Sequence, residues 1–363
     1  MRKQLLIIMT ILMMSLAAGC QSQTNEPAPE AATAQETSAQ ETPAAETPAA
    51  ESTIEESSAE EVPAAEPIAL RAVAPEGATT IAMLKMIHDQ PQIGDNVTVT
   101  YESLNTTELL AADLMGEKTD FAIAPTNLAA NFYQKGVPYS LVSVNTHGNL
   151  YMVTTEEIEG WDAIKGKTVY MIGQGLVPDL IFRYIAVSNG IDPDTDIDIE
   201  YLSGASEIAP TFLSGKASII IMPEPVLSVV STKDVAFKVL FDFQKEYEAA
   251  SGMTGGFPQA GLLVRNELIE THPAIVEAFI EQLEESCAWV NENPEDAAAY
   301  MQELDLGIPG PVVIKAMPGL NIRQDSIADS KAALEKMFGI LYEASPEAIG
   351  GAMPDEAFYQ YGQ

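Results

Sequence analysis

The chain has 363 residues, which is enough for about two domains of ordinary size. Its 53 acidic residues against 18 basic ones give a formal net charge of -35 at pH 7. Such a surface repels nucleic acid and anionic lipid headgroups, so nucleic acid is excluded as a partner.

The first 20 residues carry the features of an export signal. A basic start at Arg2 and Lys3 precedes an apolar run over residues 5–14, which is too short to span a bilayer, and small residues follow. The segment LAAGC, ending at Cys20, resembles the lipobox of bacterial lipoproteins. This resemblance implies a signal peptide over residues 1–19 and a lipid on Cys20, which would anchor the chain to the extracytoplasmic face of the cell membrane. The alternative is an ordinary secretory signal with an incidental cysteine.

The next segment, residues 20–67, predicts an acidic linker. After Cys20 it is dominated by Ala, Glu, Thr, Pro and Ser and has no Lys or Arg. It buries too little apolar area to offset its ordering entropy, so we expect a disordered spacer, or alternatively an acidic interaction tail. The remaining cysteine, Cys287, has no partner for a bridge and is expected to be a small buried residue on a helix.

The folded part is expected to begin with a strand over residues 68–75, a small-residue turn and a helix over 81–87. Free backbone N–H groups at such a helix start receive polar ligand groups, although a glycine at this kind of turn is also common without a ligand. The turn provides the candidate binding residues Glu76, Gly77, Ala78 and Thr79. A second strand starts at Val97.

A strand over residues 121–124 ends in a second candidate turn, which consists of Pro125, Thr126 and Asn127 and opens a helix over 128–134. Helix capping is the alternative role for these side chains. A strand over 139–144 and a polar break over 145–149 follow, with Asn145 and His147 as candidates. His147 is expected to be a hydrogen-bonding wall, since no second histidine or paired cysteine stands at ligand spacing and no metal site is predicted.

After a second strand that starts near residue 150, a helix near Trp161 and a strand over 168–173 lead to another turn before a helix over 180–187. This turn resembles the one after the first strand, and its Pro178 suits a first helical turn. Its candidate binding residues are Gln174, Gly175, Val177 and Pro178.

Two stretches about a hundred residues apart, 101–127 and 201–225, read as degenerate copies. Glu108 matches Glu207, Gly116 matches Gly215 and, after one residue of slippage, Pro125 matches Pro223. Each copy predicts a helix stopped by glycine and then an unalternating apolar strand ended by proline, which is typical of a sheet covered on both faces. The copies indicate two similar α/β lobes with ligand between their strand ends, unless the likeness is chance. Glu224 then occupies the position of Thr126 or Asn127.

The rest of the chain returns to the first lobe. A glycine-rich loop near residue 255 and a strand over 260–266, next to Gln259, form the expected return crossing. From Pro273 onward helical patterns cover residues 275–290, 295–304 and 327–344, and we assign them to packing.

The order of these parts resembles the substrate-binding lipoproteins of ABC importers in the nitrate, sulfonate, taurine and thiamine-pyrimidine-precursor class. The likeness rests on residues 75–80, 108–127, 165–175, 214–225 and 259–273. It implies a type II periplasmic-binding fold whose two lobes are mixed sheets flanked by helices, with lobe I at 68–148 plus 257–363 and lobe II at 149–256. It also implies a monomer that delivers a small molecule to a permease and ATPase without a cofactor. The implied cleft residues are the three turns and Glu224, with Asn145, His147 and Gln259 near the crossings.

The candidate turns contain no Arg or Lys but do contain Glu76, Asp179 and Glu224. If two of these acids face the cleft and not the solvent, a simple anion such as nitrate or a sulfonate is disfavoured. A heteroaromatic or amine-bearing ligand, such as a pyrimidine, fits better. Two alternatives remain. One is an enzyme of the same fold, acting in thiamine-pyrimidine or menaquinone precursor chemistry, although no catalytic constellation emerges and we expect no enzyme. The other is a ligand-sensing surface lipoprotein.

Overall fold

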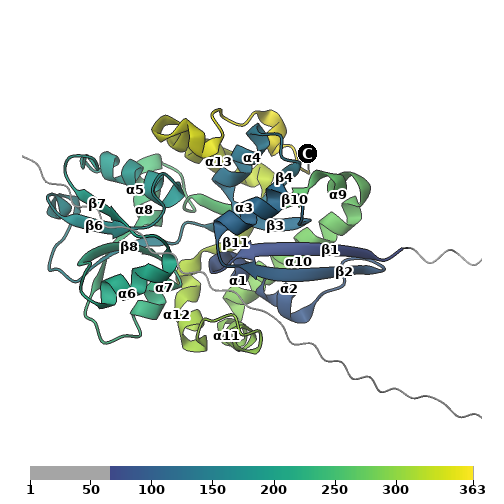
Figure 1. The fold of residues 1–363 in the computed structure, drawn as a ribbon, viewed down its shortest axis with the longest axis horizontal. Coiled ribbons are helices and arrows are strands. Elements are labelled where there is room, and N and C mark those ends of the chain that lie inside the picture. Colours follow the sequence, from purple (N-terminus) through teal and green to yellow (C-terminus); the bar gives the residue numbers. More distant parts are fainter. Residues whose placement is uncertain (1–65, 363) are drawn as a thin grey trace, which may run out of the picture. The chain divides into compact units, whose positions relative to one another are not determined.

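The computed structural model describes residues 66–362 (Figure 1). The predicted signal peptide, the lipidation site Cys20 and nearly all of the predicted linker lie outside these residues. Within residues 66–362, no helix combines the length and the apolar character that crossing a membrane requires.

The first sheet has six strands in the order β11-β4-β10-β3-β1-β2. β1 is parallel to β2 and β3, whereas β10 is antiparallel to β3 and β4, and β11 is antiparallel to β4. We call this sheet and the helices that pack on it lobe I. Its strands are β1 (Ile68–Pro75), β2 (Val97–Leu104), β3 (Phe121–Pro125), β4 (Tyr139–His147), β10 (Pro258–Arg265) and β11 (Ile322–Ser326).

The second sheet has five strands in the order β7-β6-β8-β5-β9, and with its helices it forms lobe II. β6 is parallel to β7 and β8, and β5 runs antiparallel to β8 and β9. Figure 1 shows β6, β7 and β8 grouped with α5 to α8, apart from β1, β2, β3 and β10. The strands are β5 (Leu150–Thr154), β6 (Thr168–Met171), β7 (Asp198–Tyr201), β8 (Ile219–Pro223) and β9 (Lys238–Asp242). Two separate mixed sheets confirm the predicted α/β architecture.

The two predicted copies have the same structure in both lobes. Helix α3 (Thr107–Met115) precedes β3 in lobe I, and α6 (Ile208–Leu213) precedes β8 in lobe II. The apolar runs of both strands are buried along their whole length, as expected for strands covered on both faces. Each strand has a parallel neighbour on one side and an antiparallel one on the other, and each ends at the predicted proline, Pro125 or Pro223.

Helices cover both faces of each sheet because their apolar stripes pack on it. In lobe I, α4 (Thr126–Gln134) and α13 (Ile327–Ala344) cover one face. The other face carries α1 (Ala78–Ala82), α2 (Leu84–Asp89), α10 (Pro273–Glu292), α11 (Pro294–Glu303) and α12 (Gly310–Leu320). Cys287 is buried on α10, as predicted. In lobe II, α5 (Val177–Ser188) and α8 (Phe243–Ser251) lie opposite α6 and α7 (Val226–Val230). The short elements are α9 (Asn266–Thr271) and the 3-10 turns η1 (Trp161–Ile164), η2 (Ala205–Glu207), η3 (Pro346–Ile349) and η4 (Glu356–Tyr359).

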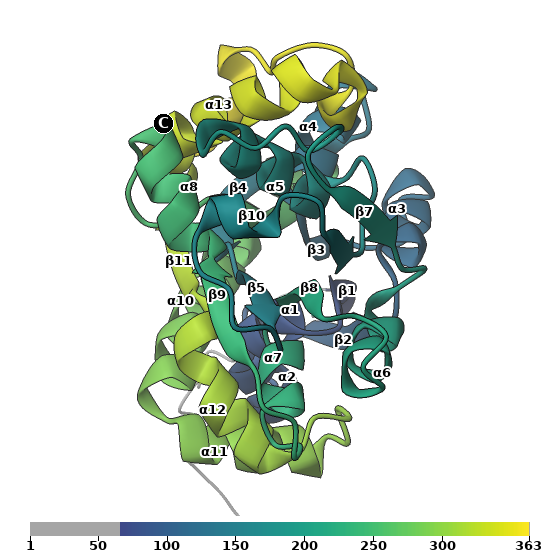
Figure 2. The same ribbon diagram turned by 90° about the vertical axis from the view of Figure 1, so that its left-hand side faces the viewer.

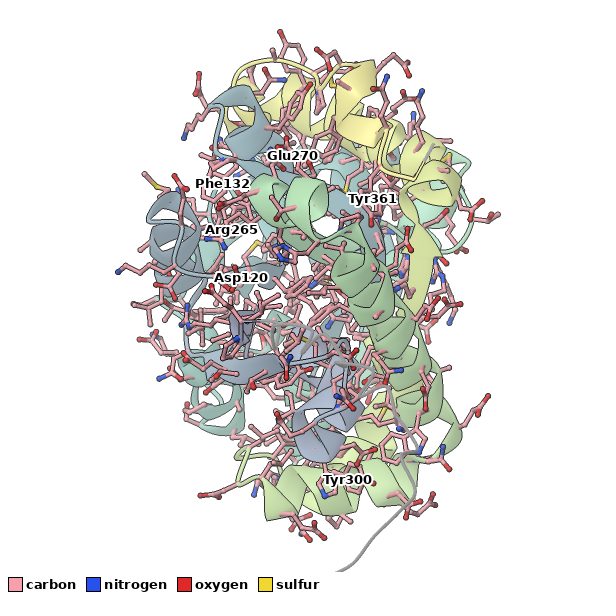
Figure 3. All side chains as sticks on the ribbon, turned by 90° about the vertical axis from the view of Figure 1, so that its right-hand side faces the viewer. Asp120, Phe132, Arg265, Glu270, Tyr300 and Tyr361 are labelled. Carbon is pink, nitrogen blue, oxygen red and sulfur yellow. The ribbon has the colours of Figure 1, made fainter. Side chains whose placement is uncertain are left out.

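An ion pair and a hydrogen bond connect β3 with its two neighbouring strands, β1 and β10, in the sheet of lobe I. The Oδ1 atom of Asp120 lies 2.7 Å from Nη2 of Arg265, and its Oδ2 accepts a hydrogen bond from the backbone N–H of Arg71 at 2.8 Å. Figure 3 shows Asp120 and Arg265 close together. Because Asp120 immediately precedes β3, its carboxylate ties β3 to β1 and β10 at the edge opposite the strand ends that carry Pro75 and Pro125.

The structure differs from the sequence prediction in several places, including the three that follow. The predicted polar break shrinks to Gly148 and Asn149, because Asn145–His147 continue β4 with β10 pairing on one side and β11 on the other. The predicted helix near Trp161 is only the 3-10 turn η1. The chain between α11 and α13 also forms α12 and β11, which the sequence analysis left unassigned.

Candidate functional site

A cleft of about 400 Å³ lies where strand ends of both sheets meet. β1 and β3 of lobe I and β8 of lobe II all end in it, and β5 and β10 begin beside it, as expected for ligand sites of α/β proteins. Among the predicted candidates, the residues in its lining are Glu76, Gly77, Ala78, Thr79, Pro125, Pro178, Glu224 and Gln259. The other lining residues were not among the predicted binding residues: Pro75, Thr107, Asn149, Leu150, Ile172, Ala205, Pro223, Pro225, Val226, Ala260 and Ile308.

Seven predicted candidates lie outside this lining: Thr126, Asn127, Asn145, His147, Gln174, Gly175 and Val177. Thr126 and Asn127 bind other parts of lobe I instead, since the hydroxyl of Thr126 donates to the carbonyl of Pro258 at 2.7 Å and the amide of Asn127 donates to Ala348 at 3.2 Å. Asn145 is fully buried in β4, and its amide has no partner among the described residues.

The turn after β1 forms part of the cleft wall in lobe I. Gly77 has φ 107°, a conformation that L side chains rarely adopt, and this lets the chain turn sharply from β1 into α1. The hydroxyls of Thr79 and Thr80 both donate to the carbonyl of Pro75. These bonds satisfy the last carbonyl of the strand and fix the turn at the edge of the cleft.

Glu224 is the buried carboxylate of the cleft, with 7% of its surface exposed. Its two oxygens accept hydrogen bonds of 3.0 Å from the backbone N–H and the hydroxyl of Ser228. Burial raises the pKa of Glu224 above its ordinary value, while the hydrogen bonds from Ser228 oppose the shift. The side chain is therefore a buried hydrogen-bond acceptor whose charged form is disfavoured by burial and supported by Ser228.

Two amide oxygens of residues that line the cleft lack partners among the described residues. The Nδ2 atom of Asn149 donates to the carbonyl of Glu224 at 3.1 Å, which leaves its Oδ1 unpaired among the described residues. The Oε1 atom of Gln259 is unpaired in the same sense. A buried acceptor without a donor costs free energy, so a donor group that reaches these oxygens from the cleft is stabilised.

The charges around the cleft are acidic. Glu76 and Glu224 belong to its lining, whereas the described residues that line it include no Lys or Arg. The positive charge of Lys315 on α12 acts on Glu224, but Lys315 is exposed and is not part of the lining. This arrangement opposes an anion and suits neutral or positively charged groups.

Asp179, the third predicted acid, has a structural role. It is 2% exposed, accepts a hydrogen bond from the backbone N–H of Gly175 at 2.8 Å, and binds Arg183 and Tyr201 at 2.9 Å each. Asp179 therefore fixes the turn between β6 and α5 but does not line the cleft. Of the binding residues predicted in that turn, Pro178 lines the cleft.

The polypeptide crosses between the lobes beside the cleft, once from β4 to β5 and once from α8 to β10. Gly148 of the first crossing donates from its backbone N–H to the carbonyl of Phe257 in the second crossing at 2.9 Å. A Cβ atom on Gly148 would lie 2.1 Å from the ring of Phe257, so only glycine allows this close approach. In the part of the chain that the structure describes, no three His, Cys, Asp or Glu side chains are arranged to hold a metal ion.

Solved structures with similar folds include a crystal structure from Parabacteroides distasonis described as an ABC transporter, with 24% identity and a TM-score of 0.71 over 82% of this chain and 100% of that chain. The periplasmic aliphatic sulphonate binding protein SsuA of Escherichia coli is 16% identical, with a TM-score of 0.66 over 80% of this chain and 94% of that one. The periplasmic nitrate-binding protein NrtA of Synechocystis PCC 6803 is 13% identical, with a TM-score of 0.60 over 81% and 84%. These likenesses show the two-lobed periplasmic-binding fold.

Among curated proteins, YtlA of Bacillus subtilis (strain 168), which carries a provisional name as a binding protein, is 24% identical over 159 residues. That match covers 43% of this chain and 45% of YtlA, so it spans less than half of the relative. The family model described as NMT1/THI5 like matches residues 96–297, which is more than half of the chain and includes parts of both lobes. The chain therefore belongs to the NMT1/THI5-like family.

Proposed function

We propose that this chain is the solute-binding component of an ABC importer. It captures a small molecule between its lobes and delivers that molecule to a permease and its ATPase. The observation that carries this proposal is the cleft between the strand ends of two sheets that are joined by paired crossings, since lobes connected in this way can close around a ligand. The structural neighbours named as ABC transporter and periplasmic binding proteins support it.

The proposed ligand is a neutral or cationic molecule rich in hydrogen-bond donors, such as an amine-bearing heteroaromatic compound of pyrimidine type. Glu224, Asn149 and Gln259 offer acceptors, and the described residues of the lining include no basic side chain to hold a nitrate or sulfonate. The relatives named for sulfonate and nitrate make such anions the alternative.

The role is binding rather than catalysis. The described lining of the cleft includes no Ser, Cys or His, and both oxygens of Glu224 are engaged by Ser228. Anchoring through Cys20 to the extracytoplasmic face of the membrane belongs to the same proposal and rests on the LAAGC segment. Labelling of the chain with radioactive palmitate, and its loss in Cys20→Ser, tests the anchor.

Thermal-shift and calorimetric titration with a panel of ligands tests the binding function. Aminopyrimidines and related heterocycles are expected to raise the melting temperature in proportion to the logarithm of their concentration, and Glu224→Ala is expected to abolish the effect. Stabilisation by nitrate or alkanesulfonates without any heterocycle would reject the ligand class. Mass spectrometry of small molecules that co-purify with the protein identifies the ligand directly.

A further inference from the structure

A second cavity of about 470 Å³ adjoins the cleft. It lies within lobe I, between the turn after β1, the end of β2 and the connection from α11 to α12. Glu76, Gly77 and Ile308 line both spaces, so the two spaces are neighbours at the turn after β1 and at the connection from α11 to α12. We call this space the arm cavity.

Two hydroxyls on one wall of the arm cavity have defined hydrogen-bonding directions. Thr80, which is 3% exposed, donates its proton to the carbonyl of Pro75 at 2.7 Å. Its oxygen lies 2.9 Å from the hydroxyl of Ser103. Because the proton of Thr80 is already used, Ser103 is the donor in that contact, and the oxygen of Ser103 is left as an acceptor at the cavity.

The remaining polar side chains in the lining are also acceptors. Glu76 and Asp305 supply carboxylates, and the described residues of the lining include no Lys, Arg or His. Met301, Leu306 and Ile308 supply apolar surface. Figure 3 labels Tyr300, the residue before Met301, on α11. An aliphatic chain that carries hydroxyl or ammonium groups matches both kinds of surface, whereas a phosphate or carboxylate meets only negative charge.

We propose that the arm cavity is a second subsite, which binds a hydroxylated or amine-bearing arm of the ligand whose ring lies in the cleft. This inference rests on the proposed solute-binding function and adds to it the size and chemistry of the ligand. The connection that forms the outer wall is a tight loop in which Asp305 and Gly307 both have positive φ, 52° and 75°. The loop lines the arm cavity together with Glu76 and Gly77, and it closes the cavity on the side of α12.

NMR titration with isolated arm fragments tests the subsite independently of the ring. Diethanolamine supplies two hydroxyls and an ammonium group, and glycerate supplies two hydroxyls and a negative charge. Diethanolamine added to the purified full-length protein is expected to give saturable shifts of the amide signals of Ser103 and Gly307. Glycerate should bind at least about tenfold more weakly, because its carboxylate faces Glu76 and Asp305.

Two variants of Ser103 localise the effect. Ser103→Trp fills the arm cavity and should abolish the shift at Gly307, whereas Ser103→Ala removes one acceptor and should weaken binding about three- to tenfold. Equal binding of the two fragments, or shifts confined to Asn149 and Val226 in the cleft, would overturn the subsite and leave the proposed function intact. Conversely, if no heterocycle, nitrate or sulfonate binds and no small molecule co-purifies, the importer function fails even where the Ser103 and Gly307 signals respond.

Discussion

The Nε2 atom of His147 lies 3.0 Å from the Oδ2 atom of Asp325, at the point where β4 ends and the chain crosses into lobe II. The same carboxylate oxygen is 3.0 Å from Nε of Arg323, and Nη2 of Arg323 donates to the carbonyl of Gly255 at 2.9 Å. Gly255 belongs to the other crossing. One carboxylate thus connects both crossings through two side chains.

This network predicts that stability depends on the protonation of His147. Burial lowers the pKa of His147, and the charge of Arg323 acts in the same direction, while Asp325 and the backbone of Asn321 oppose the shift. The unfolded chain therefore binds more protons between the lowered pKa and about 6.5, so stability should fall as the pH drops through this window. Urea denaturation at pH 7.5 and 5.5 measures this loss, and His147→Asn should reduce it.

His88 provides the matched control because its pKa is raised, whereas the pKa of His147 is lowered. Hydrogen bonds to the carboxylates of Asp89 and Glu303 raise the pKa of His88, so its contribution to stability is complete below about pH 6.5 and is lost as the pH rises through the raised pKa. His88→Asn should therefore lower stability at pH 5.5 more than at pH 7.5. The same pH dependence in both variants would contradict the assignment.

Replacement of Glu224 by glutamine should increase the stability of the protein and weaken its ligand binding. Above its ordinary pKa the buried carboxylate disfavours the folded state, and glutamine removes that charge while keeping an oxygen that can accept from the N–H of Ser228. We expect Glu224→Gln to raise the melting temperature of the ligand-free protein at pH 7.5 by roughly 2 to 4 °C and to weaken ligand binding. Equal melting temperatures of Glu224→Gln and the unsubstituted protein at pH 7.5 would show that the buried charge of Glu224 does not destabilise the fold.

Gly319 on α12 makes a contact between the lobes that leaves little room for a side chain. The hydroxyl of Tyr151 in lobe II donates to the carbonyl of Gly319 at 3.3 Å, and a Cβ atom at Gly319 would lie 2.9 Å from that hydroxyl and 3.0 Å from Cγ of Glu224. Figure 2 shows α12 beside α7 of lobe II, against which it packs. Gly319→Ala should displace Tyr151 and Glu224 and weaken ligand binding about tenfold.

The control for this substitution is Gly339→Ala, which lies in the middle of α13 with no atom within 4 Å of the added Cβ. Alanine in a helix interior is favoured over glycine by about 0.5 to 1 kcal/mol, so this variant should be more stable and bind normally. Calorimetric titration and thermal melting of the two variants measure both effects. Weaker binding by Gly339→Ala would show that a general change in stability, and not the contact at Gly319, alters affinity.

Asp179→Ala should destabilise the protein by roughly 2 to 4 kcal/mol. The change leaves the backbone N–H of Gly175 and the side chains of Arg183 and Tyr201 without their buried acceptor. Urea denaturation gives the value. Asp162→Ala removes an ion pair whose carboxylate is 91% exposed, and it should leave the denaturation midpoint unchanged. A similarly small effect of Asp179→Ala would mean that the turn after β6 does not depend on this carboxylate.

The sequence predicted the part of the fold that depends on local pattern. The apolar runs at 121–124 and 219–222 could be assigned to covered strands because they do not alternate, and the prolines at 125 and 223 marked their ends. Both prolines line the cleft, as does Glu224, which the comparison of the two copies placed beside them. Duplication thus carried information about the site that no single motif contained.

The parts of the fold and of the site that the sequence did not predict depend on contacts between distant segments. Proline and glycine in residues 310–320 disfavour a helix, yet α12 forms with Pro318 inside it because its apolar residues pack in the core of lobe I. Asn145 and His147 looked like loop residues because polar side chains rarely occupy a covered strand, and only pairing with β10 and β11 keeps them in β4. Ile172, Ala205 and Ile308 reach the cleft from three separate connections, and their spacing in the sequence gives no signal of this.

The link from His147 through Asp325 and Arg323 to Gly255 has a mechanical consequence. It couples the two crossing segments, so a change in the backbone of one is transmitted to the other. We therefore expect the two lobes to rotate as rigid bodies about one shared hinge axis, because neither crossing segment can bend independently.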